Sequence, residues 1–223
     1  MLSLQNNSWA RILFQLIGTT LILVLVPSDI IKLCLFLLFW WIMFYPLSKK
    51  EIVAFILISV AMTLNDIATV ANGVFFFTTT TFFGIPYFQT VLWAFYFLHW
   101  TRVYMKADFH VSQKRLFPAL ALLILLLGTL YFAGTHDIRL FFLGILFVIT
   151  VFFYHTYNDW CMFLYGVFTG LVIEIAGTQS GQWYYTGEFL RILNIPYWIF
   201  LVWALASWLV GQILLPLLQP QKK

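Results

Sequence analysis

Two stretches of the chain, residues 66–93 and 174–203, carry the same pattern. Each reads as an acid near the end of an apolar helix, an aromatic turn, an Ile-Pro pair and a second apolar helix. The second stretch is longer by two residues in its loop. Such a repeat predicts a fold of two similar halves. The matched pairs are Asp66 with Glu174, Gly73 with Gly181, Pro86 with Pro196 and Trp93 with Trp203.

The repeat lies in a chain with very few charges. Of its 223 residues, 63% are hydrophobic and 9% are charged, against roughly 25% charged residues in a soluble domain. So few charges cannot cover a water-exposed surface, which predicts an integral membrane protein in contact with the lipid bilayer. Short charged segments separate several apolar runs, and this arrangement is typical of a polytopic helix bundle. The basic residues are spread over the flanking loops, so we expect no nucleic-acid partner.

We expect eight transmembrane spans. Ser28 and Asp29 are good helix N-cap residues for the second span, and the Ile-Pro pairs open the fourth and the eighth. The expected spans are residues 9–26, 28–46, 51–70, 85–102, 116–133, 137–154, 159–177 and 195–218.

The duplication extends over the whole chain. Asp29 matches Asp137, and Glu51 matches Asp159, at the same spacing as the two intramembrane acids. Spans one to four therefore repeat as spans five to eight, in halves 1–110 and 111–223 of a single membrane domain. Because four is an even number, both halves enter the membrane in the same direction. The expected fold is an all-α polytopic membrane bundle of two parallel four-helix repeats.

The distribution of lysine and arginine predicts the orientation. Nine of the twelve basic residues fall on the N-terminal side of the expected spans and three on the other side. The positive-inside rule then places both termini in the cytoplasm, and we expect a bacterial inner membrane. The two aromatic hairpins, at about residues 71–84 and 178–194, would face outward.

Asp66 and Glu174 differ from the other six acids, which lie at span ends or in loops. Each lies fifteen residues beyond the acid that begins its span, Glu51 or Asp159, or roughly 20 Å along a helix. No lysine or arginine lies within a helical turn of either. An unpaired carboxylate inside the membrane indicates a functional site, and we predict that these two are catalytic. The alternative is a protonated acid that hydrogen-bonds to a neighbouring helix.

Polar and aromatic residues surround the two acids in the sequence. We expect them to line a central apolar cavity that binds a membrane lipid or an isoprenoid. Membrane-interface aromatic belts and turn formation are the alternative interpretations. The expected substrate-binding residues are Asn65, Asn72, Phe76, Trp93, Ser180, Gln182, Trp183, Tyr184, Tyr185 and Trp203.

The sequence contains no signature of a metal or cofactor site. His155 and Asp159 have a spacing suited to a metal on a helix, but two ligands do not make a site. No phosphate-binding glycine loop or dinucleotide fingerprint occurs, and no lysine lies mid-span for a Schiff base. We therefore expect no metal and no cofactor.

The pattern resembles the membrane-integral carotenoid hydratases of the bisanhydrobacterioruberin hydratase type. The likeness implies acid-catalysed addition of water to a prenyl double bond, or a related cyclisation, with Asp66 and Glu174 as the acids. In that family the two acid types occur in the reverse order. The residues that carry the resemblance are Asp66, Gly73, Ile85, Pro86, Trp93, Glu174, Gly177, Gly181, Tyr185, Ile195, Pro196 and Trp203.

Two other classes stay open at this point. One is a small-molecule or proton-coupled lipid transporter, with the acids as proton sites at the interface of the repeats. The other is a non-catalytic membrane subunit, whose acids only hydrogen-bond between helices. The sequence leaves the oligomeric state undetermined.

Overall fold

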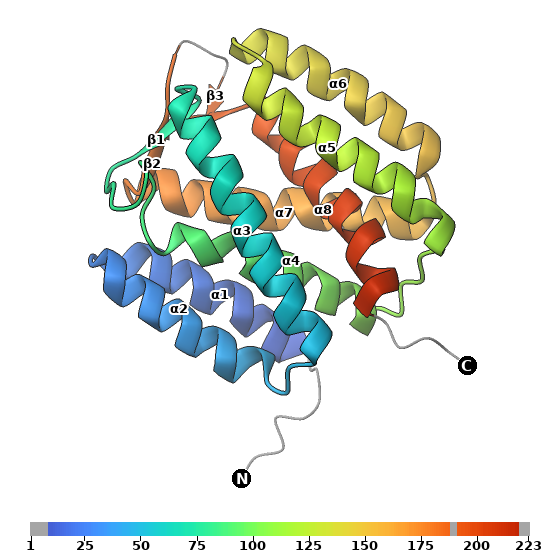
Figure 1. Ribbon diagram of the computed structural model, residues 1–223, viewed down its shortest axis with the longest axis horizontal. Helices are drawn as coiled ribbons and strands as arrows, with labels where there is room; N and C mark the ends of the chain where they lie inside the picture. The colour runs from blue at the N-terminus through green and yellow to red at the C-terminus, as the bar shows by residue number, and fades with distance from the viewer. Residues whose placement is uncertain (1–8, 188–190, 219–223) are drawn as a thin grey trace.

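The computed structural model describes residues 9–187 and 191–218, and over these it is a bundle of eight α-helices (Figure 1). The predicted all-α membrane bundle is confirmed. Five helical segments are long and apolar enough to cross a membrane: those at 49–71, 113–132, 136–153, 157–179 and 198–218. The helices are α1 Trp9–Leu25, α2 Asp29–Phe44, α3 Lys49–Ala71, α4 Gln89–Lys106, α5 Leu116–Phe132, α6 His136–Phe153, α7 Tyr157–Gln179 and α8 Trp198–Leu218.

Helices α3 and α7 have the same length and begin and end at equivalent positions of the repeat. Both have 23 residues and both begin with a capping box, Ser48 with Glu51 in α3 and Thr156 with Asp159 in α7. A capping box satisfies the free backbone N–H groups at a helix start and so fixes where the helix begins. Asp66 and Glu174 are therefore each the eighteenth residue of their helix. The division of the chain at residue 110 stays a prediction.

The Ile-Pro pairs precede helices α4 and α8 rather than opening them, which corrects the predicted start of the fourth and the eighth span. Residues 81–85 form a tight turn with Gly84 at a φ of 87°. The Asp29 carboxylate then accepts hydrogen bonds from the backbone N–H groups of Tyr87, at 2.8 Å, and Phe88. In the other half Ile195 and Pro196 form the short strand β4 (Ile195–Pro196), which pairs with β3 (Arg191–Ile192).

The two halves meet in a short antiparallel pair of strands. Strand β1 (Phe75–Phe77) pairs with β2 (Trp183–Tyr185), and the register is centred on Phe76 opposite Tyr184. These two residues are equivalent in the repeat. An antiparallel pair centred on equivalent residues is what a two-fold relation between the halves would produce.

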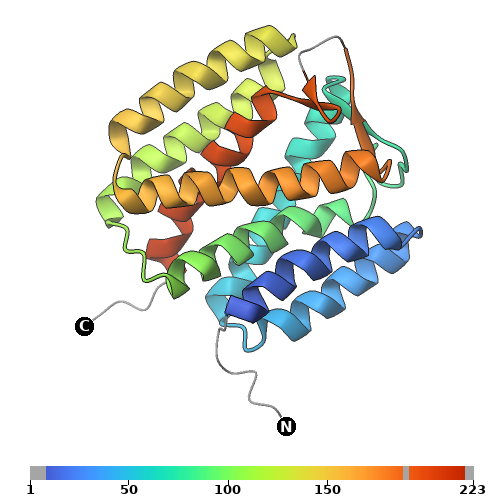
Figure 2. The same ribbon diagram turned by 180° about the vertical axis from the view of Figure 1, so that it is seen from behind.

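The helices form three layers. Helices α1 and α2 pair along one side and α5 and α6 along the opposite side, while α3, α4, α7 and α8 lie between them (Figures 1 and 2). Helix α1 packs on α7, and α5 packs on α3. Helices α4 and α8 are almost entirely buried and form the centre of the core.

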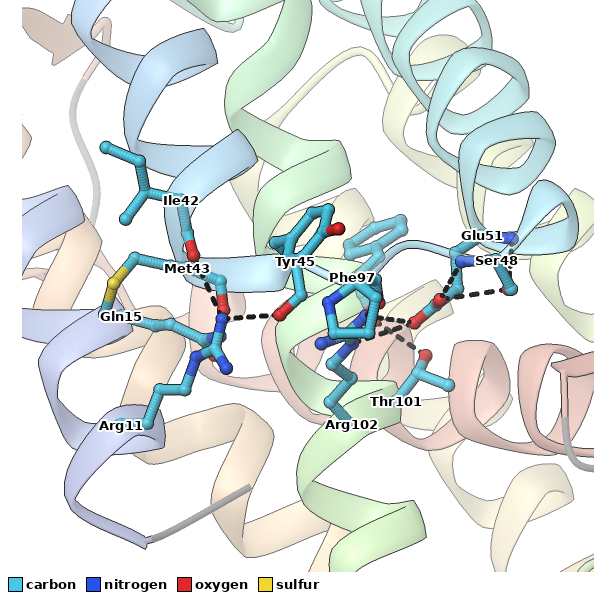
Figure 3. A network of polar contacts seen from close by, with 11 residues as sticks. Arg11, Gln15, Ile42, Met43, Tyr45, Ser48, Glu51, Phe97, Thr101 and Arg102 are labelled. Carbon is cyan, nitrogen blue, oxygen red and sulfur yellow. Dashed lines mark hydrogen bonds and ion pairs between the residues drawn. The ribbon is translucent and has the colours of Figure 1, made fainter. Parts of the chain in front are cut away.

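At the end of the bundle opposite the β1–β2 pair, buried charges are paired. Arg102 of α4 forms an ion pair of 2.8 Å with Glu51 of α3, and Arg11 donates to the carbonyl groups of Ile42 and Tyr45 (Figure 3). In the second half Asp159 accepts from Gln212 at 2.6 Å and from Arg115 at 3.1 Å. A buried charge is tolerated when it is paired in this way. Asp66 and Glu174 differ from these residues, because neither forms an ion pair within the described part of the chain.

Candidate functional site

Asp66 and Glu174 line the same cavity. Each side chain is buried, with 3% of its surface exposed, and the cavity has a volume of about 80 Å³. A water molecule needs only about 10–15 Å³ by this measure, so a part of a larger molecule fits. The walls are mostly apolar and come from α3, α4, α7, α8, strands β1 and β2, and Leu130 of α5.

Two side chains of α4 hydrogen-bond to Asp66. Its Oδ2 atom accepts from Gln89 Nε2 at 2.7 Å and from Trp93 Nε1 at 2.6 Å, both on α4. The neighbouring Asn65 of α3 also lines the cavity. Gln89 and Trp93 are four residues apart, so one face of α4 presents both donors.

Three donors hold Glu174. Its Oε2 atom accepts from Trp183 Nε1 at 3.0 Å and from the Tyr185 hydroxyl at 2.8 Å. Its Oε1 atom accepts from Trp203 Nε1 at 3.1 Å. Burial and the nearby Glu174 raise the pKa of Tyr185 well above its ordinary value. Tyr185 therefore keeps its proton and donates to Glu174 over the whole physiological pH range.

Each acid has one hydrogen-bond partner that is equivalent in the two halves, a tryptophan, and its other partners differ. Trp93 and Trp203 are equivalent in the repeat, each bonds its own acid, and their ring centroids are 4.9 Å apart. The tryptophan pair therefore joins the two carboxyl sites. The other partners are not shared, because Phe75, Phe77 and Ile199 stand at the positions equivalent to Trp183, Tyr185 and Gln89.

The two acids of the cavity are held by neutral hydrogen-bond donors and not by ion pairs. None of the ion pairs among residues 9–187 and 191–218 involves Asp66 or Glu174. Gln89 is 1% exposed, and within the same ranges its Oε1 atom has no hydrogen-bond partner. A buried acceptor without a partner is costly. A ligand with a hydroxyl group that reached Gln89 Oε1 would remove this cost.

The structure brings most of the predicted aromatic residues to the acids. Asn65, Trp93, Trp183, Tyr185 and Trp203 all line the cavity. In strand β2 alternate side chains point to opposite faces, so Trp183 and Tyr185 face the cavity together.

Five predicted site residues lie elsewhere. Phe76 and Tyr184 point away because they occupy the alternate positions of β1 and β2, and their rings pack on each other at 6.0 Å. Gln182 accepts a hydrogen bond from the buried Lys32. Asn72 and Ser180 are the C-cap residues of α3 and α7, and the Ser180 hydroxyl donates to Ala176 O at 2.6 Å. Helix capping accounts for Asn72 and Ser180, and the hydrogen bond with Lys32 accounts for Gln182.

Gln89 is a residue of the site that was not among the predicted ones. A signal was available, since Gln89 is a polar residue one helical turn before Trp93, but it was outside the pattern that the two halves share. Among the described residues no group of three or more His, Cys, Asp or Glu side chains could hold a metal ion.

Comparison with known proteins identifies the fold. No protein-family model and no curated protein sequence matches the chain. Two crystal structures of MvINS, a mycobacterial Insig homolog from Mycobacterium vanbaalenii, match with a TM-score of 0.63 and 16% identity. The match covers 79% of this chain and 98% of MvINS, and one of the structures is a cross-linked trimer.

The chain has an Insig-like fold. With its five candidate spans, this likeness makes it an integral membrane protein. At 16% identity the likeness extends to the fold alone.

Proposed function

We propose that this protein is a non-catalytic membrane subunit that binds a lipid in the cavity of Asp66 and Glu174. The ligand is a mainly apolar lipid that carries a hydroxyl group. The apolar walls suit the hydrocarbon part of the ligand. The observation that carries the proposal is the buried Gln89 Oε1 atom, an acceptor in the cavity wall without a partner in the described chain.

The hydrogen bonds of Glu174 favour binding over acid catalysis. Both carboxyl oxygens of Glu174 accept hydrogen bonds from fixed N–H or O–H donors. A general acid must instead direct its own proton at the substrate. The three fixed donors take up three of the roughly four acceptor sites of this carboxyl group and so leave little room for a proton directed at a substrate. The Insig-like fold is compatible with the same proposal.

The test is lipid binding by the purified full-length chain. We expect mass spectrometry to find a co-purified lipid with a hydroxyl group, unchanged in mass after incubation with the protein. Gln89→Leu removes the acceptor and should lower the retention of this lipid by about tenfold, since a buried hydrogen bond contributes roughly 1 kcal/mol or more. Gln113→Leu, at an exposed position outside the cavity, is the matched control. Equal retention by both variants would contradict the proposal.

A second candidate is the hydratase or cyclase suggested by the sequence resemblance. The observation in its favour is that two carboxyl groups line one mainly apolar cavity. In that case an isoprenoid substrate with a terminal double bond should gain the mass of one water molecule or be isomerised to a ring of equal mass. Glu174→Gln should abolish this change while the lipid still binds. Recovery of every offered isoprenoid in its original form, by mass and by chromatography, would exclude this candidate.

A further inference from the structure

A second pocket, which we call the apolar pocket, lies beside the cavity of Asp66 and Glu174. Its volume is about 120 Å³, and all nine residues that line it are apolar. They come from α3, α4, α5 and α8 (Figure 1). Met62 of α3 and Phe97 of α4 line both the apolar pocket and the cavity, so the two spaces share a boundary.

On α3 and α4 one helical turn leads from the hydrogen bonds of Asp66 to this boundary. Met62 is four residues before Asp66, and Phe97 is four residues after Trp93, which donates to Asp66. Residues four apart lie on the same face of a helix. Strand β1 follows α3 and precedes α4 in the chain, so both steps lead away from the β1–β2 pair.

Helices α5 and α8 also pass from the cavity to the apolar pocket. Helix α5 contributes Leu130 to the cavity and Leu127 to the apolar pocket. Helix α8 presents a stripe at four-residue intervals, of which the first two residues line the cavity and the last two line the apolar pocket: Val202, Ala206, Val210 and Leu214. All four helices therefore extend the cavity in one direction, and its lining becomes entirely apolar.

The second half of the chain is closed at the equivalent positions. Gly166 and Gly170 of α7 stand where α3 has Ile58 and Met62. A Cβ atom at either glycine would collide with α8, so α7 and α8 pack directly on each other there. The apolar pocket therefore belongs to the side of the site that holds Asp66, and the repeat does not require it.

We propose that the apolar pocket holds the hydrocarbon chain of a lipid whose hydroxyl group bonds to Gln89 Oε1. The ligand is then a long-chain alcohol with one polar end. The eight residues from Ile58 to Asp66 span about 12 Å of helix, so the chain extends over roughly this length. This inference rests on the proposed lipid-binding function, to which it adds the length and the direction of the ligand.

The two boundary residues suit a single chain. Met62 is unbranched and flexible, so a narrow chain can pass between it and Phe97. Ala61, which also lines the apolar pocket, is exposed, so the pocket reaches the lipid-facing surface of α3. A chain longer than the pocket can therefore continue into the bilayer.

The experiment locates the far end of a bound alcohol in the purified full-length protein. The probes are decanol and butanol, each with a photoreactive diazirine group at the end of its chain, and peptide mass spectrometry maps the labelled residues. We expect the decanol probe to label the apolar pocket, at Leu127 and Val210, and the butanol probe to label the cavity, at Leu130 and Val202. Excess unmodified decanol should remove the label. A decanol label confined to the cavity, or to the lipid-facing surfaces of α2 and α6, overturns the proposal.

A variant at the exposed edge of the apolar pocket tests the assignment of the chain. Ala61→Phe fills part of the pocket from an exposed position and should lower labelling by the decanol probe by about tenfold. Labelling by the butanol probe should stay unchanged. Leu64→Phe is the matched control, since Leu64 is an exposed residue of α3 outside both spaces. Equal decanol labelling in the two variants overturns the proposal.

Gln89→Leu separates this inference from the proposed function. It removes the acceptor of the hydroxyl group and should lower labelling by both probes alike. If it changes neither label, recognition of the hydroxyl group fails, and the proposed function fails with it. If it lowers both labels while the decanol label lies outside the apolar pocket, only the placement of the chain fails.

Discussion

At the scale of single residues, the two halves place equivalent acids in unequal surroundings. Glu174 accepts a hydrogen bond from the Tyr185 hydroxyl, whereas Phe77, which has no hydroxyl, stands at the equivalent position in the other half. Asp66 instead accepts a hydrogen bond from the Gln89 side-chain amide. The duplicated backbone therefore supplies two acids and two tryptophans, and the residues that differ between the copies decide what each acid can bind.

Tyr185→Phe tests the contribution of the hydroxyl to stability. Its removal leaves Glu174 Oε2 with one donor fewer and should lower the free energy of unfolding by about 1–3 kcal/mol, since the partner is a buried carboxyl group. Denaturant unfolding in detergent measures the loss. Tyr184→Phe is the matched control on the other face of β2, where the ring is 54% exposed, and should change stability by less than about 0.5 kcal/mol. Equal losses in the two variants would contradict the role given to Tyr185.

At the scale of elements, the close approach of α7 to α8 holds Glu174 in place. A Cβ atom at Gly170 would collide with the Trp203 ring, and one at Gly166 would collide with Ser207. Small residues let two membrane helices pack closely. The same spacing brings Trp203 Nε1 to Glu174, so the packing of these helices and the geometry of the site depend on each other.

Gly170→Ala should therefore disturb both the packing of α7 on α8 and the geometry of the site at Glu174. Forcing a methyl group against the Trp203 ring should destabilise the protein by about 1–3 kcal/mol. It should also lower lipid retention, because Trp203 moves away from Glu174. Gly144→Ala in α6, where no atom lies within 4 Å of the added methyl group, should be neutral or stabilise by about 0.5–1 kcal/mol. Thermal unfolding of both variants measures the difference, and a stable Gly170→Ala would refute the packing argument.

At the scale of the whole molecule, the two ends of the bundle have different chemistry. One end has the buried pair of Glu51 with Arg102 (Figure 3). The pair of the buried Asp159 with the partly exposed Arg115 is its counterpart in the second half. The start of α3 and the end of α8 meet there, since Lys50 Nζ donates to Leu217 O at 3.0 Å. The other end holds strands β1 and β2 and the candidate cavity.

Reporter fusions test the orientation of these ends. The positive-inside rule predicts that the end with most lysine and arginine residues faces the cytoplasm. A reporter fused after Lys223 should then be active only if it works in the cytoplasm. A reporter inserted at Thr79, in the exposed loop between β1 and α4, should be active only on the outer side. The reverse pair of results would invert the topology.

The sequence by itself determined the membrane bundle, the eight helices and the equivalence of Asp66 and Glu174. These follow from charge content, apolar run length and repeated residues, all of which are local or periodic properties of the chain. Only the tertiary structure decided which polar neighbours meet the acids. Gln89 reaches Asp66 from another helix, and Tyr184 turns away from Glu174 because of its place in strand β2. Side-chain direction across an interface depends on strand register and helix packing, and no single segment of sequence carries that information.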